Sequence, residues 1–244
     1  MTCLVTGGSR GIGHAIAFKL AAEGASCIVL SRNLEAARVA IAKLDCANGQ
    51  THVAAEFDVA AARRPWTAED IGGLPLQSVD VVINAAGLAQ NKLLFVSSPD
   101  EIEDIVATNL MGTIYSCRSF SRSMMRRKEG GCIVNISSVL ANRAARGSSV
   151  YAACKAGVEG LTKALATELG AKNVRVNAIR PGFIQTGMLD SHVSSDAQHA
   201  FLSSIPSSRA GTVDEVADAA LFLVKNKYCN GTILTVDGGF SSTL

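Results

Sequence analysis

This sequence has few aromatic residues and prolines, no long apolar run and no closely paired cysteines, and the last two absences exclude particular classes of protein. Aromatic residues make up 5% of the 244 residues, and proline occurs only five times. No apolar run approaches the roughly 20 residues that a membrane helix requires, so no transmembrane segment is predicted. The seven cysteines form no Cys-x-x-Cys pair and several lie in apolar runs, which predicts free thiols in a reducing compartment.

Strong net charge is also missing. The formal charge of +2 gives no electrostatic reason to expect a nucleic-acid partner, and we expect no metal site. Hydrophobic residues reach 48% and are rich in Ala, Val, Ile and Leu, which suits parallel strands covered by helices on both faces. Since a predicted strand begins almost at Met1, we expect no cleaved leader and an intracellular protein of the mitochondrial matrix or cytoplasm; an uncleaved import signal stays open.

Seven short apolar segments have the length of buried strands and alternate with helical patterns. They cover residues 2–6, 25–30, 51–57, 79–83, 131–138, 174–179 and 232–236. The alternation predicts an α/β fold, in which residues 1–244 form one Rossmann-type domain with a doubly wound parallel sheet of about seven strands and helices on both faces. A polar, Ser-rich stretch at roughly 187–210 is predicted to form a mobile lid.

Helical periodicity is clearest after the first, second, fourth and fifth strands. A capping box of Ser98 and Glu101 predicts the start of a long helix that runs to about residue 128. The segment 63–76 is different, because its prolines and glycines, such as Pro65, interrupt the pattern. We expect a short or broken helix there.

A glycine-rich turn joins the first strand to the first helix. Its spacing is Gly7-x-x-x-Gly11-x-Gly13, which differs from the common Gly-x-Gly-x-x-Gly. Glycines allow a backbone to approach a pyrophosphate closely, and the N-terminus of the following helix stabilises the negative charge. Strand, turn and helix in this order indicate a dinucleotide site, although a glycine turn alone also fits an ordinary loop.

Basic residues, and no acid, stand where the second strand ends. Folds that prefer NAD usually carry an acid here for the ribose 2′-hydroxyl. This chain has Arg32 there and Arg10 in the glycine turn, and two guanidinium groups suit a 2′-phosphate, although solvated surface arginines are the alternative. We therefore predict NADP(H) as the cofactor. After the third strand, Asp58 could bind an adenine amino group or cap a helix.

Tyr151 and Lys155 stand four residues apart in a segment with helical periodicity. Side chains at i and i+4 share one face of a helix. An ammonium beside a phenol favours the phenolate, so we predict that the pKa of Tyr151 is lowered and that its phenol transfers a proton in catalysis. The spacing alone would fit a surface pair equally well, and the neighbouring motifs favour the catalytic interpretation.

Small or polar residues follow two further strands. Asn84-Ala-Ala-Gly87 follows the fourth strand and Ser138 ends the fifth, both at the edge where open α/β sheets bind ligands. Asn109 lies inside a predicted helix despite its poor helix propensity. It is either a tolerated polar residue or a buried amide that positions another group.

Together these motifs resemble those of the short-chain dehydrogenase/reductase family over essentially the whole chain, and within it the 3-oxoacyl-[acyl-carrier-protein] reductases and their eukaryotic relatives. The resemblance rests on the glycine turn after Thr6, Asn84-Ala-Ala-Gly87, Asn109, Ser138, Tyr151-x-x-x-Lys155, Pro181-Gly182 with Thr186, and the ending Val236-Asp237-Gly238-Gly239.

The resemblance implies a role for each residue of the site. Tyr151 protonates the carbonyl oxygen as hydride arrives from the nicotinamide, and Ser138 donates a hydrogen bond to that oxygen. Lys155 binds the nicotinamide ribose and lowers the pKa of Tyr151, while Asn109 holds a water that links Lys155 to solvent. The residues implied to contact the cofactor are Gly7, Ser9, Arg10, Gly11, Ile12, Gly13, Arg32, Asp58, Val59, Asn84, Gly87, Tyr151, Lys155, Ile184 and Thr186.

The resemblance also implies a reaction, the NADPH-dependent reduction of a 3-oxoacyl thioester of acyl carrier protein or CoA in type II fatty acid synthesis. Reduction of free ketones, quinones or hydroxysteroids stays open, as does a non-catalytic dinucleotide-binding subunit. Members are commonly tetramers packed through two long helices, which implies a homotetramer, possibly with a related sister subunit.

Relatives that act on carrier-bound chains dock the acidic carrier on basic residues near the mouth of the site. Similar positions here are held by Arg126, Arg127, Lys128 and Lys172, although helix C-termini favour basic residues in any case. Arg143 and Arg146 precede the Tyr151 helix and either meet a phosphopantetheine phosphate or are solvated.

Overall fold

The computed structural model describes residues 1–61, 63–186 and 202–242, so most of the predicted lid lies outside the described residues. A sheet of seven parallel strands, in the order β3-β2-β1-β4-β5-β6-β7, forms the centre of the fold. The predicted Rossmann-type sheet is confirmed. Its strands are β1 Thr2–Thr6, β2 Ser26–Ser31, β3 Val53–Glu56, β4 Val81–Asn84, β5 Gly131–Ile136, β6 Val174–Pro181 and β7 Ile233–Val236.

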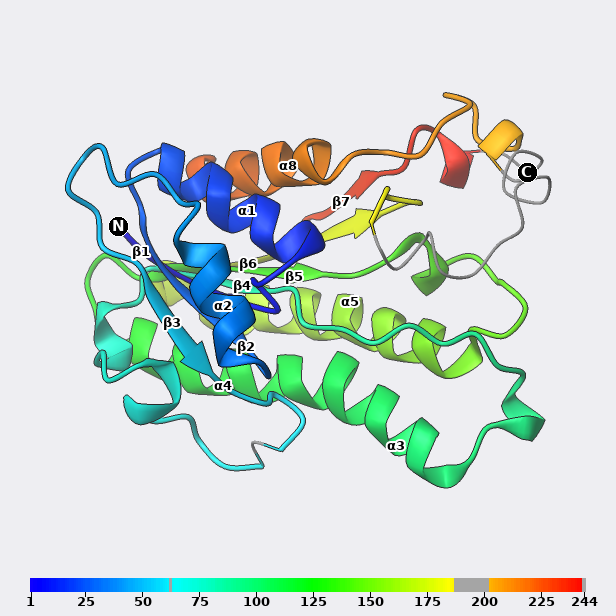
Figure 1. The fold of residues 1–244 in the computed structure, drawn as a ribbon, viewed down its shortest axis with the longest axis horizontal. Helices are drawn as coiled ribbons and strands as arrows, with labels where there is room; N and C mark the ends of the chain where they lie inside the picture. Colours follow the sequence, from blue (N-terminus) through cyan, green and yellow to red (C-terminus); the bar gives the residue numbers. More distant parts are fainter. Residues whose placement is uncertain (62, 187–201, 243–244) are drawn as a thin grey trace.

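Helices cover both faces of this sheet. Figure 1 shows α1 and α8 along one face and α3, α4 and α5 along the other. The chain order reverses between the neighbouring strands β1 and β4, and in such sheets the ligand crevice opens at the carboxyl ends of the strands beside this point. The helices are α1 Gly11–Ala22, α2 Leu34–Ile41, α3 Pro99–Val106, α4 Gly112–Met124, α5 Ser149–Leu169 and α8 Val213–Lys225.

The sheet separates two hydrophobic cores. Successive residues of a strand point to opposite faces, so Cys3 and Val5 of β1 enter the core under α1 and α8, whereas Leu4 enters the core under α4 and α5. All seven cysteines are free, as expected. Among the described helices, none combines the length and the apolarity needed to cross a bilayer.

The long helix predicted from residue 98 to about 128 is interrupted, which corrects the expectation of one regular helix. The capping box of Ser98 and Glu101 is present, but α3 ends at Val106 and a π-helical turn, Ala107–Met111, precedes α4. Asn109 lies in this turn, and its Nδ2 donates to the Ile105 carbonyl at 3.0 Å. A side chain that binds the backbone of its own helix competes with regular pairing, and π-turns are frequent at functional sites.

The segment after β3 contains no α-helix among its described residues, which confirms the prediction of a broken element. Two 3₁₀ turns, Glu69–Ile71 and Leu76–Ser78, connect β3 to β4. Trp66 lies in this segment with 3% of its surface exposed, and its ring contacts that of Phe120 at 5.6 Å between centroids. The Trp66 ring therefore helps to anchor this segment to α4, together with the hydrogen bond from the Trp66 N–H to Ser119 Oγ at 3.0 Å.

Candidate active site

Helix α5 brings Tyr151 and Lys155 to the carboxyl end of β5, where Ser138 follows the strand. The Lys155 ammonium donates to the Ile136 carbonyl at 2.8 Å and lies 5.6 Å from the centre of the Tyr151 ring. The Ser138 hydroxyl lies close enough to the phenol of Tyr151 to lower the pKa of that phenol. The three residues that the sequence predicts to act together therefore converge at one point.

The predicted direction of the Tyr151 pKa is wrong for the protein without ligands. Burial raises the pKa of Tyr151 above its ordinary value, and the nearby Ser138 hydroxyl opposes this only in part. Burial also lowers the pKa of Lys155 to about 8. The ammonium is desolvated and is bound to the backbone of β5, so the i, i+4 spacing does not produce a lowered phenol pKa.

Asn109 is fully buried and binds the turn beside Lys155. Its Oδ1 accepts from the N–H of Leu88 at 3.1 Å, and its Nδ2 donates to the Leu88 carbonyl at 3.0 Å. A Cβ on Gly87 would lie 2.8 Å from Asn109 Oδ1 and 3.7 Å from Lys155 Nζ. Of the two interpretations from sequence, the buried positioning amide is confirmed, while its implied water stays a prediction.

Gln90 also positions the catalytic helix, and the sequence analysis did not find it. Its Oε1 accepts from the N–H groups of Val150 at 2.8 Å and Tyr151 at 3.0 Å, at the start of α5. Ser148, the residue at the N-cap position, makes no side-chain capping bond. The cap comes from a residue about sixty positions away, and no local pattern announces such a contact.

The Asn84 side chain is used inside the protein, so its implied contact with the cofactor would involve the backbone and stays a prediction. Its side chain donates to Asn135 Oδ1 at 2.8 Å and to Cys117 Sγ at 3.5 Å, inside the core between β4, β5 and α4. Its buried amide therefore joins two strands and does not face a ligand. The turn that follows is held instead by Thr6, whose hydroxyl accepts from the N–H groups of Ala85 and Ala86, both at 3.1 Å.

The glycine turn has the backbone that its spacing predicts. Gly7 and Gly11 have φ angles of 64° and 57°, in the left-handed region that favours glycine. A Cβ on Gly13 would lie 2.4 Å from the carbonyl oxygen of Gly7, so this turn packs too closely for any other residue. A Cβ on Gly11 would contact only Thr186 Cγ2, at 3.8 Å, which places Thr186 next to an open side of the turn.

Ile184 lies in the segment after β6, two residues before Thr186, which lies next to the glycine turn. It forms a parallel β-bridge with Gly211 that uses the N–H of Gln185 and the carbonyl of Phe183. In such a bridge the N–H and carbonyl of the bridging residue point to the opposite side. The backbone groups of Ile184 are therefore turned away from Gly211 and are able to bind a ligand.

The groups in this crevice fit a phosphorylated dinucleotide. Arg10 and Arg32 are exposed, and neither guanidinium has an ion pair or hydrogen bond within the described parts of the chain. The buried Lys155 ammonium has one acceptor there, the Ile136 carbonyl, which leaves N–H donors for hydroxyl groups. Ser9 and Ile12 are half-buried in the turn. In the described residues, no group of three or more His, Cys, Asp or Glu could hold a metal ion.

The two residues after β3 have different surroundings. Asp58 is exposed and its Oδ1 accepts from the N–H of Ala60 at 2.9 Å, so this carboxylate closes a turn and does not cap an α-helix. Val59 is 7% exposed and packs in the core under α4. A contact between Val59 and adenine would therefore use the backbone, because the side chain packs in the core. For both Asp58 and Val59 the contact with adenine stays a prediction.

One of the predicted carrier-docking residues has a structural role. Arg127 forms an ion pair with Asp80 at 2.9 Å and donates to the Gln77 carbonyl at 2.9 Å, with its side chain 18% exposed. Its side chain is therefore engaged within the chain, and its docking role stays a prediction. Its contacts join the end of α4 to the segment before β4.

The other three docking candidates, Arg126, Lys128 and Lys172, are exposed, but they lie away from the active site of their own chain. Helices of a doubly wound sheet run opposite to the strands, so the ends of α4 and α5 lie where β5 and β6 begin. The Asn173 side chain, just before β6, donates to the Lys128 carbonyl at 3.2 Å. Within one chain, the expected position near the mouth of the site is wrong.

Arg143 is only partly exposed, and its contact with a phosphate stays a prediction. It donates to the Phe240 carbonyl and lies over the Phe240 ring, 4.8 Å from its centroid. Phe183 contacts the same ring edge-on at 5.5 Å. Arg143 therefore attaches the chain's last described turn to the loop after Ser138, whereas Arg146 is exposed.

The sequence is similar to known proteins along nearly its whole length. The family model described as enoyl-(acyl carrier protein) reductase matches residues 7–241. Carbonyl reductase family member 4 of Danio rerio is 39% identical over 236 residues, which cover 97% of this chain and 96% of the relative. The 3-oxoacyl-[acyl-carrier-protein] reductase FabG of Chlamydia muridarum is 40% identical over 243 residues, covering 98% and 96%.

Solved structures of similar proteins have the same fold as this chain. The 3-oxoacyl-[acyl-carrier protein] reductase of Brucella melitensis superposes with a TM-score of 0.88 at 32% identity and covers 98% of this chain and 90% of its own. A proposed 2-deoxy-d-gluconate 3-dehydrogenase of Agrobacterium tumefaciens, solved with bound NADP, has a TM-score of 0.86 at 33% identity, covering 99% and 96%. With its parallel sheet, glycine turn and converging Ser138, Tyr151 and Lys155, the chain belongs to the short-chain dehydrogenase/reductase family.

Proposed function

We propose that this protein is an NADP(H)-dependent reductase of 3-oxoacyl thioesters carried by acyl carrier protein or CoA. The observation that carries the proposal is the convergence of Ser138, Tyr151 and Lys155 at the carboxyl edge of the sheet, beside an open glycine turn. Relatives of nearly the same length are named 3-oxoacyl-[acyl-carrier-protein] reductases. Type II fatty acid synthesis is the setting that this activity suggests.

Two hydroxyl groups would stabilise the substrate oxygen. The Ser138 hydroxyl and the Tyr151 phenol lie near each other, so both would donate to one carbonyl oxygen placed between them. The phenol is protonated at neutral pH, as a proton donor in a reduction must be, although burial raises its pKa and makes it a weaker acid than an ordinary tyrosine. NADPH, when bound, supplies the hydride.

Lys155 would resupply the proton. Because burial lowers its pKa to about 8, the ammonium gives up a proton more readily than an ordinary lysine. Its Nζ retains N–H donors beyond the one bound to the Ile136 carbonyl, and these suit the hydroxyl groups of a ribose. The same side chain would therefore hold the cofactor and serve as a proton source for Tyr151.

Steady-state kinetics would test the proposed reaction. Acetoacetyl thioesters of acyl carrier protein and of CoA, a crotonyl thioester and a free quinone are compared, each with NADPH and NADH. We expect the acetoacetyl thioesters with NADPH to have the highest kcat/KM. Turnover of free ketones or quinones alone would favour the general carbonyl reductase, and turnover of crotonyl thioester alone would identify an enoyl reductase.

A Tyr151→Phe variant separates an enzyme from a dinucleotide-binding subunit. The variant lacks the proton donor but retains the ring, so we expect NADPH oxidation to fall by at least about a hundredfold, the lower range for general acid catalysis. NADPH affinity, measured by fluorescence titration, should stay within about twofold of the parent. Unchanged turnover would contradict the assigned proton donor.

A dimer across the long helix is supported by its charge pattern. The α3 half carries exposed Asp100, Glu103 and Asp104, whereas the α4 half carries exposed Arg118 and Arg122. Two copies packed antiparallel along this helix would pair the acidic half of one with the basic half of the other. We propose that such pairing forms part of a homotetramer, whose dissociation at high salt is measurable by light scattering.

Antiparallel packing would also bring the basic end of one chain to the active-site edge of the other. This arrangement gives Arg126, Lys128 and Lys172 a position at the mouth of the partner's site, where an acidic carrier protein would dock. A Lys128→Glu variant should then lose kcat/KM for the carrier-bound substrate while retaining that for the CoA thioester. Equal losses for both substrates would contradict docking at this end.

A further inference from the structure

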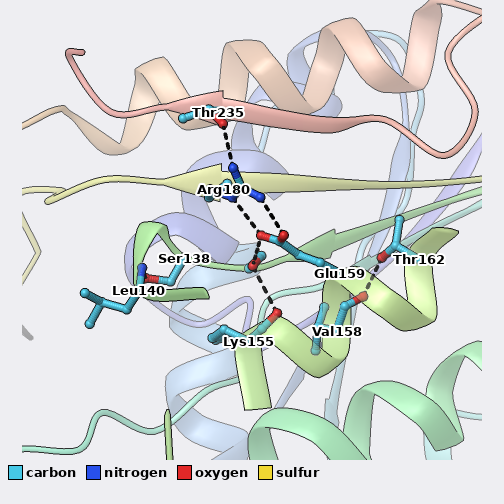
Figure 2. Close-up of polar contacts among 9 residues, drawn as sticks. Ser138, Leu140, Lys155, Val158, Glu159, Thr162, Arg180 and Thr235 are labelled. Atoms are coloured by element: carbon cyan, nitrogen blue, oxygen red, sulfur yellow. Dashed lines mark hydrogen bonds and ion pairs between the residues drawn. The ribbon is translucent and has the colours of Figure 1, made fainter. Parts of the chain in front are cut away.

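A buried ion pair lies directly beside the catalytic residues. Glu159 is on α5, one turn after Lys155, and pairs with Arg180 near the end of β6 (Figure 2). Arg180 Nε donates to Glu159 Oε1 at 2.8 Å and Arg180 Nη2 donates to Oε2 at 2.5 Å. The Glu159 side chain is 10% exposed and that of Arg180 17%, so two full charges are held largely away from water.

The Glu159 carboxylate also binds the strand that carries Ser138. The Ser137 hydroxyl donates to Glu159 Oε1 at 2.8 Å and lies 3.2 Å from the carbonyl of Lys155. On the other side, Arg180 Nη1 lies 3.5 Å from Thr235 Oγ1 of β7 (Figure 2). One carboxylate and one guanidinium therefore connect α5 with the residue that follows β5, with β6 and with β7.

Each end of this network is adjacent to a part of the active site. Ser137 immediately precedes Ser138, and Arg180 immediately precedes Pro181, where β6 ends and the segment toward Ile184 begins. Glu159 shares the helix face of Lys155 by its i, i+4 spacing. The network therefore joins three segments. One carries Ser138, the second is α5 with Tyr151, and the third is the backbone after Pro181 at the proposed nicotinamide end.

Stability alone does not explain this pair. Removing two charges from water costs several kcal/mol each, and replacing a buried ion pair by apolar residues of similar volume is often neutral or stabilising. A bidentate guanidinium–carboxylate pair does fix both distance and orientation, which two apolar side chains do not. A displacement of about 1 Å between reacting groups can reduce a rate by about a hundredfold.

We propose that Glu159 and Arg180 are positioning residues that fix α5, with Tyr151 and Lys155, against Ser138 and the segment after Pro181. Neither side chain touches the substrate in this arrangement. The kinetic consequence rests on the proposed reduction, whereas the structural consequence is measurable in the protein without ligands.

The test compares Glu159→Gln and Arg180→Met with Glu168→Gln, which changes an exposed acid of the same helix. We expect the two pair variants to lower kcat by about tenfold or more, the size of effect that misplacement produces. The primary deuterium isotope effect on kcat should rise, because hydride transfer becomes slower than product release. Glu168→Gln should leave every value at the parent level.

Hydrogen exchange in the ligand-free protein provides a second measurement. The amides at the start of α5, from residue 150 to 155, should exchange faster in both pair variants while those of β1 stay protected. This result does not depend on the substrate, so it holds even where the parent turns over no acetoacetyl thioester. A failure of the proposed function is thereby distinguished from a failure of the positioning role.

A double variant, Glu159→Leu with Arg180→Met, covers the case in which a single change leaves an unpaired buried charge and prevents folding. It removes both charges, so we expect parental thermal stability together with a low kcat and a raised isotope effect. Parental kcat and isotope effect in this double variant would overturn the proposal, as would single variants that unfold earlier yet turn over at the parental rate and show parental exchange in α5.

Discussion

Replacing Lys155 with methionine should stabilise the protein at pH 7 while abolishing its activity. Burial lowers the pKa of Lys155 to about 8 from an ordinary value of 10.5. Each pH unit corresponds to about 1.36 kcal/mol, so at neutral pH the buried ammonium destabilises the folded state by about 3 kcal/mol. Methionine has a similar length and no charge, and this penalty disappears with it.

The gain is reduced by one lost hydrogen bond. The Lys155 ammonium donates to the Ile136 carbonyl at 2.8 Å, and methionine leaves that carbonyl without this donor, a loss of about 1 kcal/mol. The net increase in the free energy of unfolding is then about 2 kcal/mol. For a chain of this size, about 2–4 °C of melting temperature accompanies each kcal/mol, so the variant should melt about 4–8 °C higher.

The pH dependence of the free energy of unfolding shows whether the buried charge of Lys155 causes the difference in stability. Below pH 8 Lys155 is protonated in both the folded and the unfolded state, and the full penalty applies. Between pH 8 and 10.5 the unfolded state binds more protons than the folded state, so the parent's free energy of unfolding rises with pH. Lys155→Met lacks this rise. The advantage of the variant should therefore be largest at pH 7 and disappear by about pH 10.5.

Urea denaturation of both proteins at several pH values measures this difference at a fixed protomer concentration. Tyr151 and the other cysteines titrate in both proteins, so their contributions cancel in the comparison, whereas the pKa of Cys154 rises when the Lys155 ammonium is removed. Lys163→Met, a change of an exposed lysine on the same helix, is the matched control and should stay within about 0.5 kcal/mol of the parent. A Lys155→Met protein that is less stable at pH 7, or whose advantage does not change with pH, would refute the burial argument.

Three further changes test individual contacts. Gly87→Ala places a methyl group 2.8 Å from Asn109 Oδ1, so it should lower stability by about 1–3 kcal/mol and reduce kcat; a parental melting temperature would contradict this packing. Gln90→Leu removes an acceptor for the Tyr151 N–H and should lower stability by about 1–2 kcal/mol and also kcat, which thermal unfolding and kinetics would measure; equal kcat would exclude a role in positioning. Arg32→Ala should raise the KM for NADPH about tenfold and leave that for NADH unchanged; equal effects on both would exclude a contact with the 2′-phosphate.

Local sequence patterns were sufficient to predict the sheet and most of the site. The strands are continuous apolar runs because both faces of the sheet are covered by helices, as Cys3 and Leu4 of β1 illustrate by entering opposite cores. The glycine turn is encoded within seven residues, since Gly7 and Gly13 each meet a steric requirement that only glycine satisfies. Where the residues that determine a local structure lie in the same segment as that structure, the sequence alone predicts it.

Contacts between distant segments account for most of the differences. Asn84 binds Asn135 on the neighbouring strand, and Arg127 binds Asp80 across 47 positions of the chain. An asparagine also suits a ligand-binding amide, and an arginine also suits a docking cation. The identity of a side chain does not reveal which partner it has in the folded protein. Gln90 was not recognised for the same reason, since its capping of α5 depends on how the turn after β4 packs.

The pKa of Tyr151 illustrates how one pattern supports opposite conclusions. The i, i+4 spacing correctly places the ammonium of Lys155 near the phenol, but the consequence depends on water. In an exposed pair the neighbouring charge would dominate and lower the pKa of the phenol. Here Lys155 is buried and Tyr151 is half-buried, so desolvation dominates, which raises the pKa of Tyr151 and lowers that of Lys155. The Lys155 ammonium thus becomes a clearly stronger acid than the Tyr151 phenol, which favours proton transfer from Lys155 to the Tyr151 phenolate after each reduction.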